Sequence, residues 1–145
     1  MENKMREILF RGKRTDNGAW VEGAFCLKDC DDPFGDMVDR PSIIKYDPPC
    51  DGFWFRVDPE TVGQFTGLTD KNGKKIFEGD ILKESDVIYN GEIQINGHIF
   101  TVAMRKGCWC VLSTCYFDEW DFLCSNANRC EVIGNIHDNP ELLEE

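Results

Sequence analysis

Apolar and polar residues alternate in short stretches along most of this 145-residue chain. In the segment 53–58, FWFRVD, the side chains of Phe53, Phe55 and Val57 fall on one face of a strand, because residues two apart share a face. Three dipeptides tolerate the positive φ that tight hairpin turns require, and each predicts a connection between strands: Asn17-Gly18, Asn72-Gly73 and Asn96-Gly97. The pattern predicts an all-β protein.

The N-terminal part is predicted to be a β-hairpin with strands at residues 6–13 and 19–28. Residues 29–51 contain seven Asp and four Pro around one apolar run, Ile43–Tyr46. Asp and Pro disfavour strands, so this segment is predicted to be a long acidic loop that carries a single edge strand at 43–46.

The second part is predicted to be a meander that turns at Gly73, Gly79, Gly91 and Gly107. Its predicted strands are residues 61–69, 75–77, 80–84, 87–89, 92–96, 98–105, 108–115 and 131–136. Closure would remove the exposed edges of such a meander, so we expect a small SH3-like or similar β-barrel. Residues 116–128 leave a helical turn and a packed loop both open. Asn139-Pro140 predicts the start of a short C-terminal helical turn.

These elements suggest two regions within one compact unit. Residues 1–58 form the N-terminal hairpin and acidic loop, and residues 59–145 form the small barrel.

Charge narrows the range of partners. The chain has 27 acidic and 16 basic residues and a net charge of −11, which disfavours direct binding to nucleic acid because that binding depends on Lys and Arg. Neither a signal-peptide pattern nor an apolar stretch long enough for a membrane span is seen, so we expect a cytoplasmic protein with its eight cysteines reduced.

Candidate chemistry is sparse. Eight cysteines with His98 and His137 allow a zinc site to be drawn, but alternate cysteines such as Cys108 and Cys110 in a strand pattern favour core packing. No sequence motif supplies a nucleophile with a base, and His137-Asp138 favours turn capping over acid–base chemistry. We therefore expect no enzyme activity, no cofactor and no bound metal. A metal-dependent enzyme that uses Asp118, Glu119 or Asp121 is an alternative.

Three segments resemble one family. They are GAWVEG at residues 18–23, FTGLTDKNGKKIFEGDIL at 65–82 and VIGNIHDNPELL at 132–143. In these segments the chain resembles the YopX family of phage and prophage proteins. The resemblance implies an all-β fold, a phage or prophage origin and self-association, and it supplies no catalytic residues.

The leading hypothesis is a non-enzymatic module for protein interaction or self-assembly in the host cytoplasm. Its expected partners are a second copy of the chain and a host or phage protein, without direct contact to nucleic acid or membrane. Trp54 lies opposite Phe53 and Phe55 in the strand pattern, so one set is left exposed as a contact site. The interaction residues are predicted to be Trp54 and, at its polar rim, Asp29, Asp31, Asp32, Asp36 and Asp39. An acidic protein that mimics DNA and inhibits a host nucleic-acid-binding protein is the second hypothesis.

Overall fold

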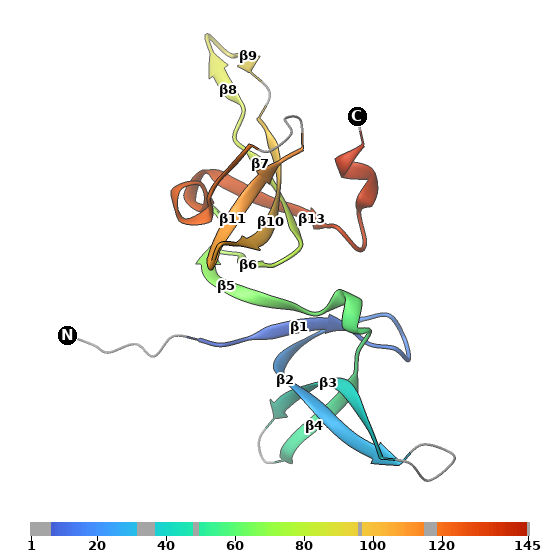
Figure 1. Ribbon diagram of the computed structural model, residues 1–145. Helices are drawn as coiled ribbons and strands as arrows, with labels where there is room; N and C mark the ends of the chain where they lie inside the picture. The colour runs from blue at the N-terminus through green and yellow to red at the C-terminus, as the bar shows by residue number, and fades with distance from the viewer. Residues whose placement is uncertain (1–6, 32–36, 48–49, 96, 115–118, 145) are drawn as a thin grey trace, which may run out of the picture. The chain divides into compact units, whose positions relative to one another are not determined.

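The computed structural model describes residues 7–31, 37–47, 50–95, 97–114 and 119–144, with the backbone alone for residues 28–31, 37–39, 46–47, 50–52 and 95. Strands dominate these residues, and the helical segments are all short 3-10 turns. The prediction of an all-β protein is therefore confirmed. The chain forms two compact units, Met1–Phe65 and Thr66–Glu145 (Figure 1).

The first unit is an antiparallel sheet with the strand order β4-β3-β2-β1-β5. Its elements are β1 (Phe10–Lys13), β2 (Trp20–Asp31), β3 (Met37–Asp47), β4 (Cys50–Arg56), the 3-10 turn η1 (Pro59–Thr61) and the beginning of β5 (Gly63–Thr69). The predicted hairpin around Asn17-Gly18 is confirmed, with Gly18 at a φ of 71° between β1 and β2.

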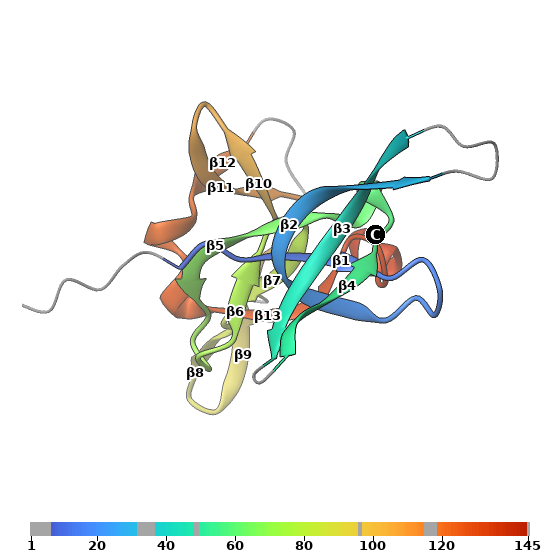
Figure 2. The ribbon, with the colours of Figure 1, turned by 90° about the horizontal axis from the view of Figure 1, so that it is seen from below.

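The predicted acidic loop at residues 29–51 is wrong over its described part. The long strands β2, β3 and β4 occupy it and lie side by side in Figure 2. Ile43–Tyr46 is also not an edge strand, because β3 lies between β2 and β4. Asp and Pro are poor strand formers locally, but pairing with two neighbouring strands outweighs that preference.

A small core explains which side chains of this sheet turn inward. Ile43 is fully buried, and Phe25 and Phe55 lie directly beside it on the neighbouring strands. Ile43 clusters with the buried Val21 and Val57. Gly12 allows this packing, because a Cβ atom there would lie 2.9 Å from the Cβ of Val57.

The second unit contains a five-stranded antiparallel sheet with the order β12-β11-β10-β7-β13 and a separate hairpin, β8–β9. The strands are the end of β5, β6 (Lys75–Phe77), β7 (Asp80–Glu84), β8 (Val87–Tyr89), β9 (Glu92–Ile95), β10 (Ile99–Arg105), β11 (Cys108–Ser113), β12 (Trp120–Phe122) and β13 (Cys130–Asn135). The 3-10 turns are η2 (Leu123–Ser125), η3 (Ala127–Arg129) and η4 (Pro140–Leu143). The prediction of a short C-terminal helical turn is confirmed, and residues 119–128 of the open segment form β12, η2 and the start of η3.

The expected closed barrel is not present among the described residues. The five-stranded sheet ends at β12 on one side and β13 on the other. The reason lies in the middle of the predicted meander: β8 and β9 pair only with each other, and β7 pairs directly with β10 and β13. In the first unit, one isolated bridge joins Val57, just after β4, to Arg14, just after β1, and β5 then pairs with the other side of β1.

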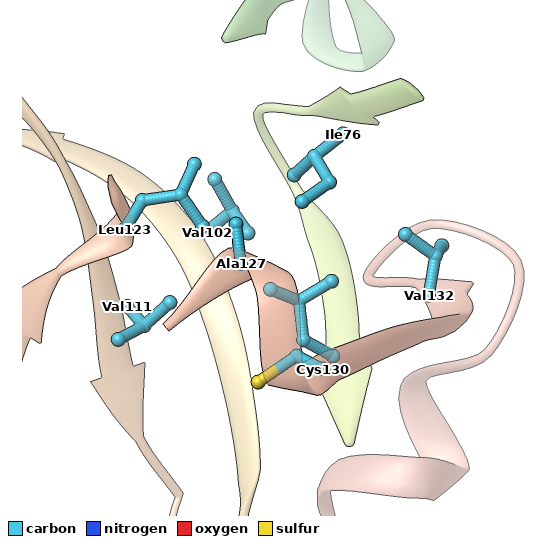
Figure 3. Close-up of a cluster of buried hydrophobic side chains, with 8 residues drawn as sticks. Ile76, Val102, Val111, Leu123, Ala127, Cys130 and Val132 are labelled. Atoms are coloured by element: carbon cyan, nitrogen blue, oxygen red, sulfur yellow. The ribbon is translucent and has the colours of Figure 1, made fainter. Parts of the chain in front are cut away.

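The core of the second unit is larger than that of the first. Figure 3 shows its side chains, which are Ile76, Leu82, Val102, Val111, Leu123, Ala127, Cys130 and Val132. Cys110 and Cys130 are fully buried, as core packing predicts, whereas Cys108 and Cys124 are exposed. No helix in the described part of the chain is long and apolar enough to cross a membrane.

Candidate functional site

Trp54 lies on β4, an edge strand of its sheet. Its side chain is 49% exposed, and so is that of Phe53, the preceding residue on the opposite face of the strand. Beside Trp54 lies a hollow of about 360 Å³, lined by Arg14, Thr15, Asp16, Trp54, Phe55 and Arg56. Trp54 is therefore exposed, but Phe53 on the other face is exposed as well, whereas the strand pattern predicted that only one of the two sets is exposed.

Arg14 organises the hollow. Its guanidinium lies 4.5 Å from the ring centre of Phe55 and donates to both carboxylate oxygens of Asp16, at 2.9 and 2.5 Å. The hydrogen bond from Arg14 lowers the pKa of Asp16 below its ordinary value. The hollow therefore carries fixed charges of both signs next to an exposed indole.

The structure describes only part of the predicted acidic rim. The backbones of Asp29 and Asp39 lie opposite each other in the β2–β3 pair, and Asp31 lies opposite Met37. The side chains of these three residues, and Asp32 and Asp36 as a whole, lie outside the described residues. Whether they surround Trp54 stays a prediction.

A larger cleft, of about 560 Å³, opens in the second unit. It is lined by Glu84, His98, Phe100, Val111, Ser113, Glu119, Trp120, Asp121, Asn126 and Arg129. Residues of β7, β10, β11, β12 and η3 thus meet in one place, together with Asn126 between η2 and η3. Glu119 and Asp121 are two of the metal ligands of the alternative enzyme hypothesis, and Asp118, named with them, lies outside the described residues.

Asn126 is the centre of the polar network in this cleft and is only 1% exposed. Its Nδ2 donates to the Asp121 carboxylate at 3.0 Å and to the carbonyl of Phe122 at 2.8 Å. Its Oδ1 accepts from Nη2 of Arg129. One buried amide therefore fixes both a carboxylate and a guanidinium at the rim.

Glu84 holds the other end of the network. Its carboxylate lies 3.5 Å from Nε of Arg129 and 3.5 Å from Nδ1 of His98. The charge of Arg129 is thereby matched inside the cleft.

Asp121 stays ionised in this setting. The hydrogen bond from Asn126 and the backbone N–H of Phe122, at 2.8 Å, lower the pKa of Asp121 and outweigh the effect of its slight burial. No ion pair to Glu119 or Asp121 is formed within the described ranges.

Cys130, the residue after Arg129, does not support a zinc site or a nucleophile at this cleft. Burial, and then the charge of Glu84, raise the pKa of Cys130 to about 11, so its thiol stays protonated at neutral pH. No group of three or more His, Cys, Asp or Glu side chains in the described part of the chain is arranged to hold a metal ion. His137 and Asp138 cap a turn through their backbone N–H groups, which donate to Oδ1 of Asn135.

Sequence reasoning does not find the cleft as a site. Glu84, His98 and Arg129 are separated by 14 and 31 residues and carry no recognisable motif. The one available signal is Trp120 between two carboxylates, in the sequence EWD.

The comparison with known protein families agrees with the resemblance of the segments 18–23, 65–82 and 132–143. The family model described as "YopX protein" matches residues 9–144. The chain belongs to the YopX family. The match covers both units, so the YopX assignment applies to the first unit and to the cleft-bearing second unit alike.

A solved structure, "Crystal structure of protein EF1440 from Enterococcus faecalis", is similar to this YopX chain. The two share 26% sequence identity and a TM-score of 0.52, over 97% of this chain and 100% of the other. No curated protein matches the chain.

Proposed function

We propose that this YopX-family chain is a non-enzymatic interaction module, encoded by a phage or prophage, that acts in the host cytoplasm. In this proposal it associates with a second copy of itself, and with a host or phage protein, through Phe53 and Trp54 of β4. Membranes and nucleic acids are not among the proposed partners. The five cysteines whose side chains are described are free thiols, which agrees with a reducing compartment.

One observation carries the proposal. Phe53 and Trp54 are consecutive residues of β4, and each is 49% exposed. Consecutive strand residues point to opposite faces, so each face of the sheet leaves one aromatic side chain of β4 half exposed. Large aromatic side chains that stay half exposed are the usual anchors of protein contacts.

The surface around Trp54 suits a second copy of the chain. Arg56 is exposed on β4, and Asp16 is exposed across the hollow. In a two-fold dimer each patch meets an identical patch, so a surface with both signs of charge allows Arg56 of one copy to lie near Asp16 of the other. A patch of one sign alone would repel its copy.

The test is the substitution Trp54→Glu, followed by size-exclusion chromatography with light scattering. We expect the wild type to be an oligomer and Trp54→Glu to have the mass of a single chain, because a carboxylate replaces an aromatic side chain that the proposed contact between copies would bury. Tyr89→Glu places the same charge at another exposed aromatic residue, 67% exposed and in the other unit, and should leave the mass unchanged. A monomeric wild type, or a Trp54→Glu variant with the wild-type mass, contradicts the proposal.

A further inference from the structure

Four Asn-Gly pairs occur in the chain, at residues 17–18, 72–73, 90–91 and 96–97. Asn followed by Gly is the sequence most prone to spontaneous deamidation, in which the backbone nitrogen of the second residue attacks the side-chain amide carbon of the first. Gly has no Cβ atom to hinder that attack. The nitrogen must first lose its proton, so the hydrogen bond of each glycine N–H decides how readily the pair reacts in the folded protein.

The pair Asn17-Gly18 is held at both reacting groups. The N–H of Gly18 donates to the carbonyl of Arg14 at 2.9 Å. The side-chain Oδ1 of Asn17 accepts the N–H of Ala19 at 3.0 Å. The attacking nitrogen and the amide that it would attack therefore each have a hydrogen bond that must break before they react.

Two further glycine N–H groups are also held. That of Gly73 donates to the carbonyl of Asp70 at 3.0 Å, and the buried carboxylate of Asp70 accepts the N–H of Asn72 at 2.8 Å. The N–H of Gly97 donates to Oδ1 of Asp86 at 2.7 Å, and the residue before Gly97 lies outside the described residues. Both turns are thus tied to a carboxyl residue.

The pair Asn90-Gly91 differs from these. It is the exposed two-residue turn between β8 and β9, with φ values of 54° and 80°, closed by the pairing of Tyr89 with Glu92. Positive φ at both positions is typical of a type I′ turn. The N–H of Gly91 donates no hydrogen bond to any residue that the structure describes. The two strands pair only with each other, so the turn opens more readily than one anchored in a larger sheet.

We propose that Asn90 is a site of spontaneous deamidation, which changes the tip of the β8–β9 hairpin irreversibly. Hydroxide from the solvent removes the proton of the Gly91 N–H, and this nitrogen forms a bond to Cγ of Asn90. The bond between Cγ and the side-chain nitrogen breaks, and ammonia leaves after taking a proton from water, which restores the hydroxide. Water then opens the resulting succinimide ring at either carbonyl and gives aspartate or isoaspartate.

The reaction alters both the charge and the backbone of the hairpin. Residues 87–95 carry one carboxylate, Glu92, and no Lys or Arg, so one new carboxylate changes their net charge from −1 to −2. Isoaspartate also lengthens the backbone of a two-residue turn by one carbon atom, and the turn then loses the geometry that pairs the strands. The site lies in the second unit and does not depend on self-association through Trp54.

The experiment is incubation of the full-length protein in mildly alkaline buffer, with samples digested over several days and analysed by mass spectrometry. Cleavage after Glu places Asn17, Asn72 and Asn90 on separate peptides, residues 8–22, 61–78 and 85–92, and each peptide contains a single Asn. We expect Asn90 to react at least about fivefold faster than Asn17 or Asn72, which is the factor that one hydrogen bond contributes. Hydrogen exchange should also be faster at the Gly91 amide than at those of Gly18 and Gly73.

Two controls show whether the fold causes the difference. In guanidinium chloride the chain is unfolded, and the three pairs should react at similar rates because the same dipeptide is then equally accessible. The Trp54→Glu variant is incubated beside the wild type, because the proposed contact between copies approaches Asp16 and could protect the neighbouring Asn17. The order of the three rates should be the same in this variant.

Reaction of Asn17 or Asn72 as fast as Asn90 in the folded protein overturns the proposal. An equally large lead of Asn90 in the unfolded chain overturns it as well, because the sequence would then be the cause. So does an unreactive Asn90 in a folded protein whose three pairs all react when unfolded. None of these results depends on the mass of the protein in solution, so this proposal and the proposed function can fail independently.

Discussion

At the residue scale, buried polar side chains fix the turns of the second unit. Asp70 is 6% exposed, and its carboxylate accepts the backbone N–H groups of Asn72, Lys74 and Val132 at 2.8, 2.9 and 3.0 Å. It thus closes the Asn72-Gly73 turn and joins that turn to β13, 62 residues away. Asp80 similarly accepts the N–H of Phe77 at 2.8 Å, in the turn that Gly79 makes with a φ of 88°.

Replacement of Asp70 by Ala should lower the free energy of unfolding by about 2–4 kcal/mol, because three N–H groups lose one shared acceptor and that of Val132 is buried. Chemical denaturation measures the loss. Asp138→Ala is the control: Asp138 is exposed and bonded at 3.2 Å to Asn135, and its loss should cost about 1 kcal/mol or less. Equal losses in the two variants contradict the assigned role of Asp70.

The pH dependence of stability gives a second readout of the same residue. Burial raises the pKa of Asp70, but the three backbone N–H donors outweigh it and lower the pKa below 3.8. A carboxyl with a lowered pKa in the folded state stabilises above its unfolded pKa, and this contribution is lost as the pH falls through the folded value. The advantage of the wild type over Asp70→Asn should therefore be constant at neutral pH and shrink as the pH falls below 3.8. An advantage that does not change on acidification contradicts this assignment.

At the element scale, the β8–β9 hairpin stands apart from the sheet of its own unit. Its strands pair only with each other, and Figure 1 shows them extending away from β7 and β10. Its large apolar side chains are 52–67% exposed and belong to neither core cluster; they are Val87, Ile88, Tyr89 and Ile93. An isolated two-stranded hairpin has little stability of its own, so it adds little to that of the unit.

Deletion of Val87–Ile95, with two glycines in its place, should therefore leave the melting temperature within about 3 °C of the wild type, since no cluster of the core loses a member. The deletion variant keeps Asp86 and Gly97, because the N–H of Gly97 donates to Asp86 at 2.7 Å. Deletion of β6, which carries the buried Ile76, is the opposite control and should unfold the unit. A large fall in melting temperature on removal of the hairpin would show that it contributes to the fold.

At the scale of the whole molecule, two separate cores stabilise the chain. Ile43 is fully buried in the cluster of the first unit, and Ile76 is fully buried in that of the second. Each core belongs to one compact unit, and β5 begins in the first unit and ends in the second.

Ile43→Ala and Ile76→Ala should each cost about 2–5 kcal/mol, because each leaves a cavity in a packed core. Hydrogen exchange should locate the damage, with faster exchange in β2, β3 and β4 for the first variant and in β7, β10 and β13 for the second. Ile88→Ala, at a side chain that is 64% exposed, is the matched control and should cost about 0.5 kcal/mol or less. Faster exchange throughout both units in either core variant would show a single cooperative core.

The sequence by itself determined the strands and turns whose signals are local. Period-two patterns predicted β6, β7 and β8 with their observed bounds, and the Asn-Gly dipeptides marked the turns after β1 and β5. The strand patterns also predict six buried side chains, Trp20, Phe65, Ile76, Ile81, Val132 and Ile136. Phe65, Ile76, Ile81 and Val132 are buried, whereas Trp20 is only partly buried and Ile136 is 40% exposed because it lies beyond the end of β13. Local backbone preference and side-chain alternation are sufficient for such features.

Only the tertiary structure decided which strands pair and which side chains meet. Residues 29–51 contain Asp and Pro that predict a loop, yet β3 becomes an inner strand because β2 and β4 satisfy its backbone on both sides. The meander does not close, because β8–β9 leaves it and β7 pairs with β13 from the end of the chain. The cleft, too, unites Glu84, Asn126 and Arg129 from separate elements. Such pairings depend on the free energy of long-range contacts, which no local pattern of residues encodes.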